Sequence, residues 1–421
     1  MNAAASRVRQ SWRRPSVLAL AATALLGLSG CGGAGQATPS GPSAASLTGP
    51  TLATSLVGAD GASWAVVEMG GSAATFDNFW ELFVRPAGGS DWKLATPAGA
   101  ASNGGLVMAQ AGPGTLVTGF RPSQKLTFSP LAASADAGAQ WSQDALVDPG
   151  LADVPGALAG SPAGGLLALT DTGAVESGTG LGASWTRLTT LAALAGSPSG
   201  RACGLTALTA VAWSPSGSPM VAGDCRTPGV AGIFVLTAGS WRASSPALAA
   251  GLSRTGTDLL GLATASGRTT AILATGAGAH RSVIAAWSAD GSHWTLSPAL
   301  TARVGAAGAA PSVSFFAAGS SGLVLTPGSR AGSASRAYTI GWRAARWQPL
   351  PSLPAGASGS PSAPASTGQI ATLAAAADGS LEALVVSRGT LTVWQLGSVV
   401  GPSGWSLAQI LRVPVPYGSS G

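Results

Sequence analysis

The sequence predicts an all-β fold built from seven similar units of four short strands. Tryptophans recur at intervals of about fifty residues, each close after a cluster of turn-forming residues. Short apolar runs bounded by Gly, Ser, Asp and Pro recur between them, and no long segment has the 3.6-residue period of a helix. The recurring tryptophans are Trp92, Trp141, Trp185, Trp241, Trp294, Trp347 and Trp405.

The N-terminal segment has the ordered features of an export signal. Four arginines without any acid precede an apolar stretch, residues 17–28, that is too short to span a bilayer. It ends in Leu28-Ser29-Gly30-Cys31, which resembles the bacterial lipobox, so we expect residues 1–30 to be removed and Cys31 to carry lipid. The alternative is an ordinary secretory signal with a chance cysteine. The pair Arg13-Arg14 leaves the choice between the general and twin-arginine export routes open.

Residues 31–49 are mostly Gly, Ala, Ser, Thr and Pro, which predicts a flexible tether. The expected location is the outer face of the cell membrane, with the chain held by its lipid. Removing the signal removes four arginines, so 22 − 4 = 18 bases remain against 16 acids. No basic run is left to follow phosphates, which argues against nucleic-acid binding.

The repeat explains why one domain should cover residues 50–412, followed by a tail, 413–421. In the first unit the four runs are TLATSLV, SWAVVEM, FWELFVRP and WKLATP. A single sheet of this kind cannot bury both faces, whereas sheets stacked around an axis can, so the repeat predicts a seven-bladed β-propeller. The blades are expected at 50–98, 99–150, 151–195, 196–250, 251–300, 301–355 and 356–412. Ring closure is expected to rely on side-chain packing, because the first unit starts with an innermost strand and the last ends with an outermost one.

Two cysteines remain once Cys31 is taken by lipid. Cys203 is expected in the first strand of the fourth unit, and Cys225 ends its second run, PMVAGDC. Antiparallel neighbours would bring them together, which predicts a disulfide in an oxidising compartment. The alternative is two free buried thiols.

Two units contain a sharper motif. Residues Ser134, Asp136, Gly138 and Trp141 follow the pattern S-x-D-x-G-x-x-W, and a version one residue shorter contains Ser288, Asp290, Gly291 and Trp294. These segments resemble the Asp-box of the bacterial neuraminidase repeats, which are found in sialidases and related propellers. The resemblance implies a hairpin between the third and fourth strands of a blade, with structural rather than catalytic residues.

The resemblance also raises an enzymatic alternative, a sialidase-like glycoside hydrolase. That family uses a tyrosine nucleophile, a glutamate and three substrate-binding arginines. Here Tyr338 is the one tyrosine outside the C-terminal tail, and the family's Phe-Arg-Ile-Pro signature is absent. The chain has four glutamates, Glu68, Glu81, Glu176 and Glu382, and only two histidines, His280 and His293.

No cluster has metal-ligand spacing, so neither a metal nor a cofactor is expected. The sequence therefore predicts a non-catalytic, monomeric surface lipoprotein that binds or scaffolds a protein or glycan of the envelope. Further tryptophans could stack on sugars, although packing between blades is the commoner role of such residues. These are Trp80, Trp287, Trp342 and Trp394.

Overall fold

The computed structural model describes most of the chain from residue 55 to residue 413. The described residues are 55–57, 62–69, 80–98, 105–112, 114–120, 131–142, 151, 155–179, 184–252, 255–265, 267–276, 280–303, 312–316, 321–326, 336–342, 344–354, 369–375, 380–387, 390–396 and 404–413. The predicted signal, the tether and Cys31 lie outside them, as do residues 414–421 of the predicted tail.

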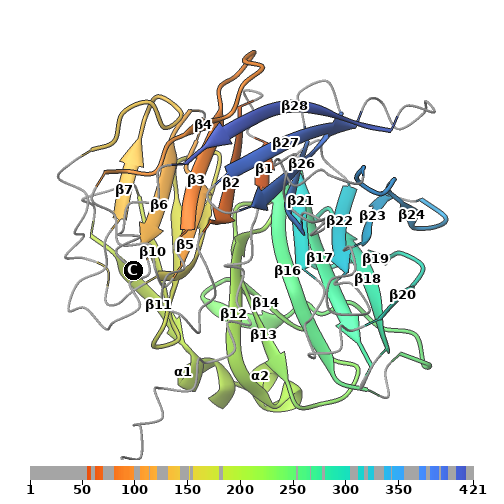
Figure 1. Ribbon diagram of the computed structural model, residues 1–421. Coiled ribbons are helices and arrows are strands. Elements are labelled where there is room, and N and C mark those ends of the chain that lie inside the picture. Colours follow the sequence, from red (N-terminus) through yellow and green to blue (C-terminus); the bar gives the residue numbers. More distant parts are fainter. Residues whose placement is uncertain are drawn as a thin grey trace, which may run out of the picture. The chain divides into compact units, whose positions relative to one another are not determined.

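The described strands form seven antiparallel sheets, each made from consecutive strands (Figure 1). The first three sheets contain β1 (Ser55–Val57), β2 (Ser63–Glu68), β3 (Trp80–Arg85) and β4 (Lys93–Leu94); β5 (Leu106–Gln110), β6 (Leu116–Phe120) and β7 (Leu131–Ser134); and β8 (Pro155–Gly160), β9 (Leu166–Thr170), β10 (Ala174–Gly178) and β11 (Thr186–Thr190).

The remaining four sheets follow in the same order along the chain. They contain β12 (Leu205–Trp213), β13 (Pro219–Cys225), β14 (Gly232–Thr237) and β15 (Ser240–Ala243); β16 (Thr257–Ala265), β17 (Arg268–Thr275), β18 (His280–Ser288), β19 (Trp294–Leu296) and β20 (Leu300–Arg303); β21 (Ser312–Phe316), β22 (Ser321–Thr326), β23 (Arg336–Gly341) and β24 (Gln348–Pro349); and β25 (Gln369–Ala375), β26 (Leu381–Ser387), β27 (Thr390–Leu396) and β28 (Trp405–Arg412).

Two details differ from the sequence prediction, and one part of it, the fourth strand of the second sheet, is not tested by the described residues. The second sheet has three described strands, because the segment expected to form its fourth strand lies mostly outside the described residues. The fifth sheet has five strands, since both β19 and β20 pair with β18. Two short helices, α1 (Leu191–Gly196) and α2 (Pro198–Cys203), separate the third sheet from the fourth.

β3 is buried on both faces. Its side chains alternate between two hydrophobic clusters because successive residues of a strand point to opposite faces. Trp80, Leu82 and Val84 pack with residues of the second sheet, whereas Phe83 packs with residues of the seventh. The largely apolar character of this short strand therefore follows from burial on both sides.

Each sheet shares a hydrophobic cluster with the next sheet along the chain, from the first through to the seventh. A further cluster joins the seventh sheet to the first. It combines Val67, Phe83 and Trp92 with Leu384 and Val393. The two ends of the repeat thus pack against one another.

The recurring tryptophans connect successive sheets by hydrogen bonds as well as by packing. Trp294 Nε1 donates to the backbone oxygen of Ser244, at 2.6 Å, and Trp347 Nε1 donates to that of Pro298, at 2.8 Å. Trp405 Nε1 donates to the backbone oxygen of Pro351, at 2.7 Å. Each accepting oxygen lies three or four residues after the tryptophan of the preceding unit, which explains why this residue type returns at one place in the repeat.

Candidate functional site

The segment around Asp136 forms a tight turn directly after β7. Ser134 Oγ donates to Asp136 Oδ1 at 2.7 Å, and the Gly138 and Gln140 amides donate to Ser134 Oγ and Asp136 Oδ1 at 2.7 and 2.8 Å. Gly138 has a φ of 88°, which other residues rarely adopt. The bonds from the Gln140 amide and the Ser134 hydroxyl hold the pKa of the exposed Asp136 carboxyl below its usual value. Every polar group named here is engaged in shaping the turn.

The segment around Asp290 joins β18 to β19 in a similar way. The Ser292 and His293 amides donate to Asp290 Oδ1 at 2.7 and 2.8 Å, and Gly291 N donates to Ser288 Oγ at 2.8 Å. The His293 ring lies 2.6 Å from Asp290 Oδ2, and this contact holds the pKa of Asp290 far below, and that of His293 above, the ordinary values. Trp141 and Trp294 are half-buried, and each packs against a hydrophobic cluster between two sheets.

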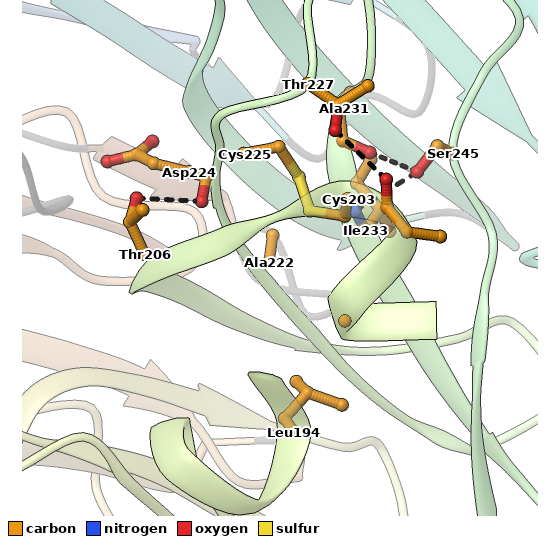
Figure 2. Close-up of a disulfide and its surroundings, with 12 residues drawn as sticks. Leu194, Cys203, Thr206, Ala222, Asp224, Cys225, Thr227, Ala231, Ile233 and Ser245 are labelled. Atoms are coloured by element: carbon orange, nitrogen blue, oxygen red, sulfur yellow. Dashed lines mark hydrogen bonds between the residues drawn. A yellow bond between two sulfur atoms is a disulfide. The ribbon is translucent and has the colours of Figure 1, made fainter. Parts of the chain in front are cut away.

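The disulfide between Cys203 and Cys225 is present, with the two Cα atoms 5.2 Å apart (Figure 2). Cys203 does not lie on the strand expected from the sequence but at the end of α2, two residues before β12 begins. Leu205, the first residue of β12, is the register partner of Cys225. The bond therefore ties the helical connection to the end of β13 in the fourth sheet.

Three of the four glutamates are buried, and each already has a partner. Glu81 accepts a hydrogen bond from the Thr96 hydroxyl, and burial raises the pKa of its carboxyl above the usual value against the effect of that bond. Glu176 lies 3.2 Å from the guanidinium of its cross-strand neighbour Arg187. Glu382 lies 2.5 Å from Arg85. Glu68, at the end of β2, is half-buried.

The Arg85–Glu382 pair is the centre of a polar cluster between the first and seventh sheets. Trp92 Nε1 donates to Glu382 at 2.9 Å, and Arg85 also donates to Ser63 Oγ, at 2.9 Å, and lies over the Trp92 ring. The Gln409 side chain accepts from Trp92 N at 2.8 Å and donates to Trp92 O at 2.9 Å. The Gln409 amide thereby forms the same pair of bonds that a neighbouring strand would form.

The groups required by the sialidase-like alternative lie in different parts of the molecule. Tyr338 is on β23, in the cluster with Trp287, Trp342 and Trp347 between the fifth and sixth sheets. The buried glutamates lie on β3, β10 and β26, in the first, third and seventh sheets. The structure therefore places the proposed nucleophile in an aromatic packing cluster, apart from the carboxylates that would assist it.

The first strands of the seven sheets are poor in charge. Across these strands as described, from β1 to β25, Asp258 on β16 is the single ionisable residue, and it forms a salt bridge with Arg281. The partly exposed positions of β8, β12 and β16 are otherwise small or aliphatic, apart from Trp213 at the end of β12. They are Gly156, Leu158, Ala159, Gly160, Ala207, Leu208, Leu260, Ala263, Thr264 and Ala265, with Thr206 exposed.

Within the described part of the chain, no group of three or more His, Cys, Asp or Glu residues is placed to hold a metal ion. No helix in the same part is long and apolar enough to cross a membrane. Trp80 and Trp287 are buried, and Trp342 and Trp394 are half-buried within the clusters between sheets.

The sequence matches no known protein family and no curated protein. Several solved structures are similar to it. The GH74 xyloglucanase of Xanthomonas campestris has a TM-score of 0.52 at 16% identity over 86% of this chain, which spans 55% of that enzyme. The periplasmic gluconolactonase of Pseudomonas aeruginosa has a TM-score of 0.49 at 12% identity (84% and 98% of the two chains), and the six-bladed Aleuria aurantia lectin 0.40 at 14% (75% and 96%).

The fold is a β-propeller. Identities this low show the fold alone, because propellers support unrelated functions through the side chains that they carry. What the sequence reasoning missed is the polar cluster around Glu382. Its members come from positions 63, 85, 92, 382 and 409. The signal available beforehand was charge inside two largely apolar runs, Glu81 and Arg85 in FWELFVRP and Glu382 in LEALVV.

Proposed function

We propose that the chain is a non-catalytic, lipid-anchored β-propeller that binds or scaffolds a partner at the outer face of the cell membrane. The observation that carries this proposal is the near absence of ionisable side chains on the described first strands of the sheets, where Asp258 is the single one. General acid–base or nucleophilic catalysis needs positioned ionisable groups, whereas recognition can use backbone groups, hydroxyls and apolar side chains.

We also propose that the seven sheets are the blades of one closed ring. Trp294, Trp347 and Trp405 each donate a hydrogen bond to the preceding sheet, and Trp92 of the first unit donates to Glu382 of the seventh. A tryptophan hydrogen bond to another sheet thus also crosses the two ends of the repeat, where its acceptor is a carboxylate instead of a backbone oxygen. Closure would then depend on side chains, with Gln409 in place of a shared strand.

The lipid anchor at Cys31 is tested by mass spectrometry of the native protein. We expect residues 1–30 to be absent and the Cys31 residue to carry the mass of the acyl groups. An unmodified Cys31 in a soluble, secreted form contradicts the anchor. The same experiment on Cys31→Ala, which cannot accept the lipid, is expected to give an unprocessed precursor.

The absence of sialidase activity is tested with a fluorogenic sialoside. We expect no turnover above background by the native protein, and no difference for Tyr338→Phe. Turnover that Tyr338→Phe abolishes overturns the proposal in favour of a sialidase-like hydrolase.

The binding role is tested by photo-crosslinking in the native envelope. A photoreactive residue at Thr206, which is exposed on β12, is compared with one at Leu407, which is 47% exposed on the outermost strand β28. We expect a reproducible adduct with a protein or glycan from position 206 and none from position 407. Equal labelling from both positions, or none from 206, contradicts recognition at the first strands.

A further inference from the structure

The helical connection between the third and fourth sheets is held firmly in place. Besides the disulfide, Thr227 N and Thr227 Oγ1 donate to the backbone oxygens of Cys203 and Ala202, both at 3.0 Å. A Cβ at Gly200 would lie 2.0 Å from the Leu194 carbonyl oxygen, so α1 and α2 touch through this glycine. Leu194 and Cys203 are buried in the cluster between the two sheets. The outer side of the connection is therefore a rigid surface.

Three exposed arginines surround this connection. Arg201 is in the last turn of α2, where it donates to the Gly196 carbonyl, Arg226 follows β13, and Arg242 is on β15.

Backbone contacts bring the segments that carry these arginines together. Arg226 N donates to the backbone oxygen of Gly204, at 3.1 Å, directly after α2. Ala243 N, next to Arg242, donates to Ser199 Oγ in α2, at 3.3 Å. We call Arg201, Arg226 and Arg242 the arginine face.

No carboxylate neutralises the arginine face within the described residues. Neither helix contains an acidic residue in its first turn, and none of the three arginines takes part in the salt bridges of the described chain. Asp224 lies two residues from Arg226, but burial and the nearby Asp258 raise its pKa, the opposite of what a close guanidinium would do. Glu176 is already paired with Arg187.

The surroundings of the arginine face favour a flat anionic surface over a protein partner. The exposed neighbours in the helices are small, namely Ala192, Ala193, Gly196, Pro198 and Ala202. Protein interfaces concentrate their binding energy in tryptophan, tyrosine and arginine anchors that fit into pockets. The nearby Trp241 is half-buried against the cluster between the sheets instead. Arginine binds phosphate oxygens through two parallel N–H groups.

We propose that the arginine face docks the domain onto anionic phospholipid headgroups. This proposal rests on the lipid anchor proposed above, which keeps the domain beside a membrane. Attraction between basic side chains and an anionic leaflet decays within the Debye length of about 8 Å at physiological ionic strength. The contact therefore sets which side of the tethered propeller meets the membrane, while the lipid holds the chain there.

The test uses the native lipidated protein in vesicles and a dicarbonyl reagent that modifies exposed arginines, read by peptide mass spectrometry. Two exposed arginines serve as internal controls: Arg346, between β23 and β24, and Arg412, at the end of β28. With phosphatidylglycerol in the vesicles, we expect Arg201, Arg226 and Arg242 to lose most of their modification while the two controls keep theirs. With phosphatidylcholine alone, or at high salt, we expect all five to be modified equally.

Equal modification of all five arginines on phosphatidylglycerol vesicles overturns the proposal. So does equal protection of the arginine face on phosphatidylcholine, because the contact would then not be electrostatic. If poly-glutamate protects the arginine face from modification and anionic vesicles do not, the partner is an acidic polypeptide and the membrane proposal is wrong. A failure of the proposed lipid anchor is distinguished by flotation, because a chain without lipid does not float with vesicles of either composition.

A variant supplies the matched comparison. The triple substitution Arg201→Gln, Arg226→Gln and Arg242→Gln keeps the side-chain length and removes three exposed charges. We expect it to float with the vesicles through its lipid and to melt at an unchanged temperature. Cleavage within residues 191–203 on anionic vesicles, by a protease that does not cut at arginine, should be slower for the native protein than for the variant. Equal cleavage rates for the two proteins contradict docking through these arginines.

Discussion

Asp290 and His293 form an exposed pair within one turn, and each shifts the other's pKa. A lowered carboxyl pKa adds stability that is lost as the pH falls through the folded value, and a raised histidine pKa adds stability that is lost as the pH rises through its folded value. The pair therefore stabilises the folded protein at pH values between the folded-state pKa of Asp290 and that of His293. We expect Asp290→Asn to lower the pKa of His293 towards 6.5, measured by NMR titration with His280 as the internal reference. An unchanged titration of His293 contradicts the pairing.

Trp92 and Trp141 occupy equivalent places in the repeat but differ in burial. Trp92 is 1% exposed and donates to Glu382, whereas Trp141 is half-buried and its Nε1 has no partner in the described chain. We expect Trp92→Ala to lower the free energy of unfolding by about 3–5 kcal/mol, as for other large buried aromatics, and Trp141→Ala by less. Thermal and denaturant unfolding of both variants measures this, and an equal loss contradicts it.

The disulfide belongs to the connection between two sheets, because Cys203 ends α2 and Cys225 ends β13. The cysteines are 22 residues apart, so the chain-entropy relation gives a contribution of about 3 kcal/mol to stability. We expect Cys203→Ala with Cys225→Ala to lose about that amount and to speed amide exchange within residues 191–203 more than in β17. Exchange that rises equally in both segments would show that the bond does not act locally.

The two helices show where local sequence patterns stop being informative. Residues 191–203 read LAALAGSPSGRAC, a run too short for the helical period to separate it from a strand or turn. Thr190 and Ser197 cap the two helices by accepting bonds from Ala193 N and Gly200 N, at 3.1 and 3.0 Å. The strands were more predictable, because burial on both faces leaves a continuous apolar run between turn residues.

The contact between the first and seventh sheets gives a prediction for the whole molecule. Arg85 and Glu382 are each buried, so removing one leaves an uncompensated charge between the sheets. We expect Arg85→Met to cost about 3–5 kcal/mol of stability, and the double variant Arg85→Met with Glu382→Leu to cost less. Denaturant unfolding measures both, and a double variant less stable than the single one contradicts this account.

Arg187→Met provides the matched control. Its partner Glu176 is also buried, but the Arg187 side chain is 56% exposed and lies within one sheet. We expect a loss of about 1 kcal/mol or less, because water screens an exposed guanidinium. If Arg187→Met loses as much unfolding free energy as Arg85→Met, the location of the Arg85–Glu382 pair between the first and seventh sheets does not make its loss more destabilising.

The sequence by itself determined the all-β class and the repeated unit, since these follow from short-range patterns of apolar and turn residues. It also predicted the pairing of Cys203 with Cys225, the two cysteines that remain once Cys31 is set aside. The tertiary structure decided which side chains meet across the ends of the repeat. Trp92 and Gln409 are separated by 317 residues, and no local pattern links them. It also decided that Tyr338 is a packing residue and that the segments carrying three exposed arginines meet around α2, because such proximity exists only after the chain has folded.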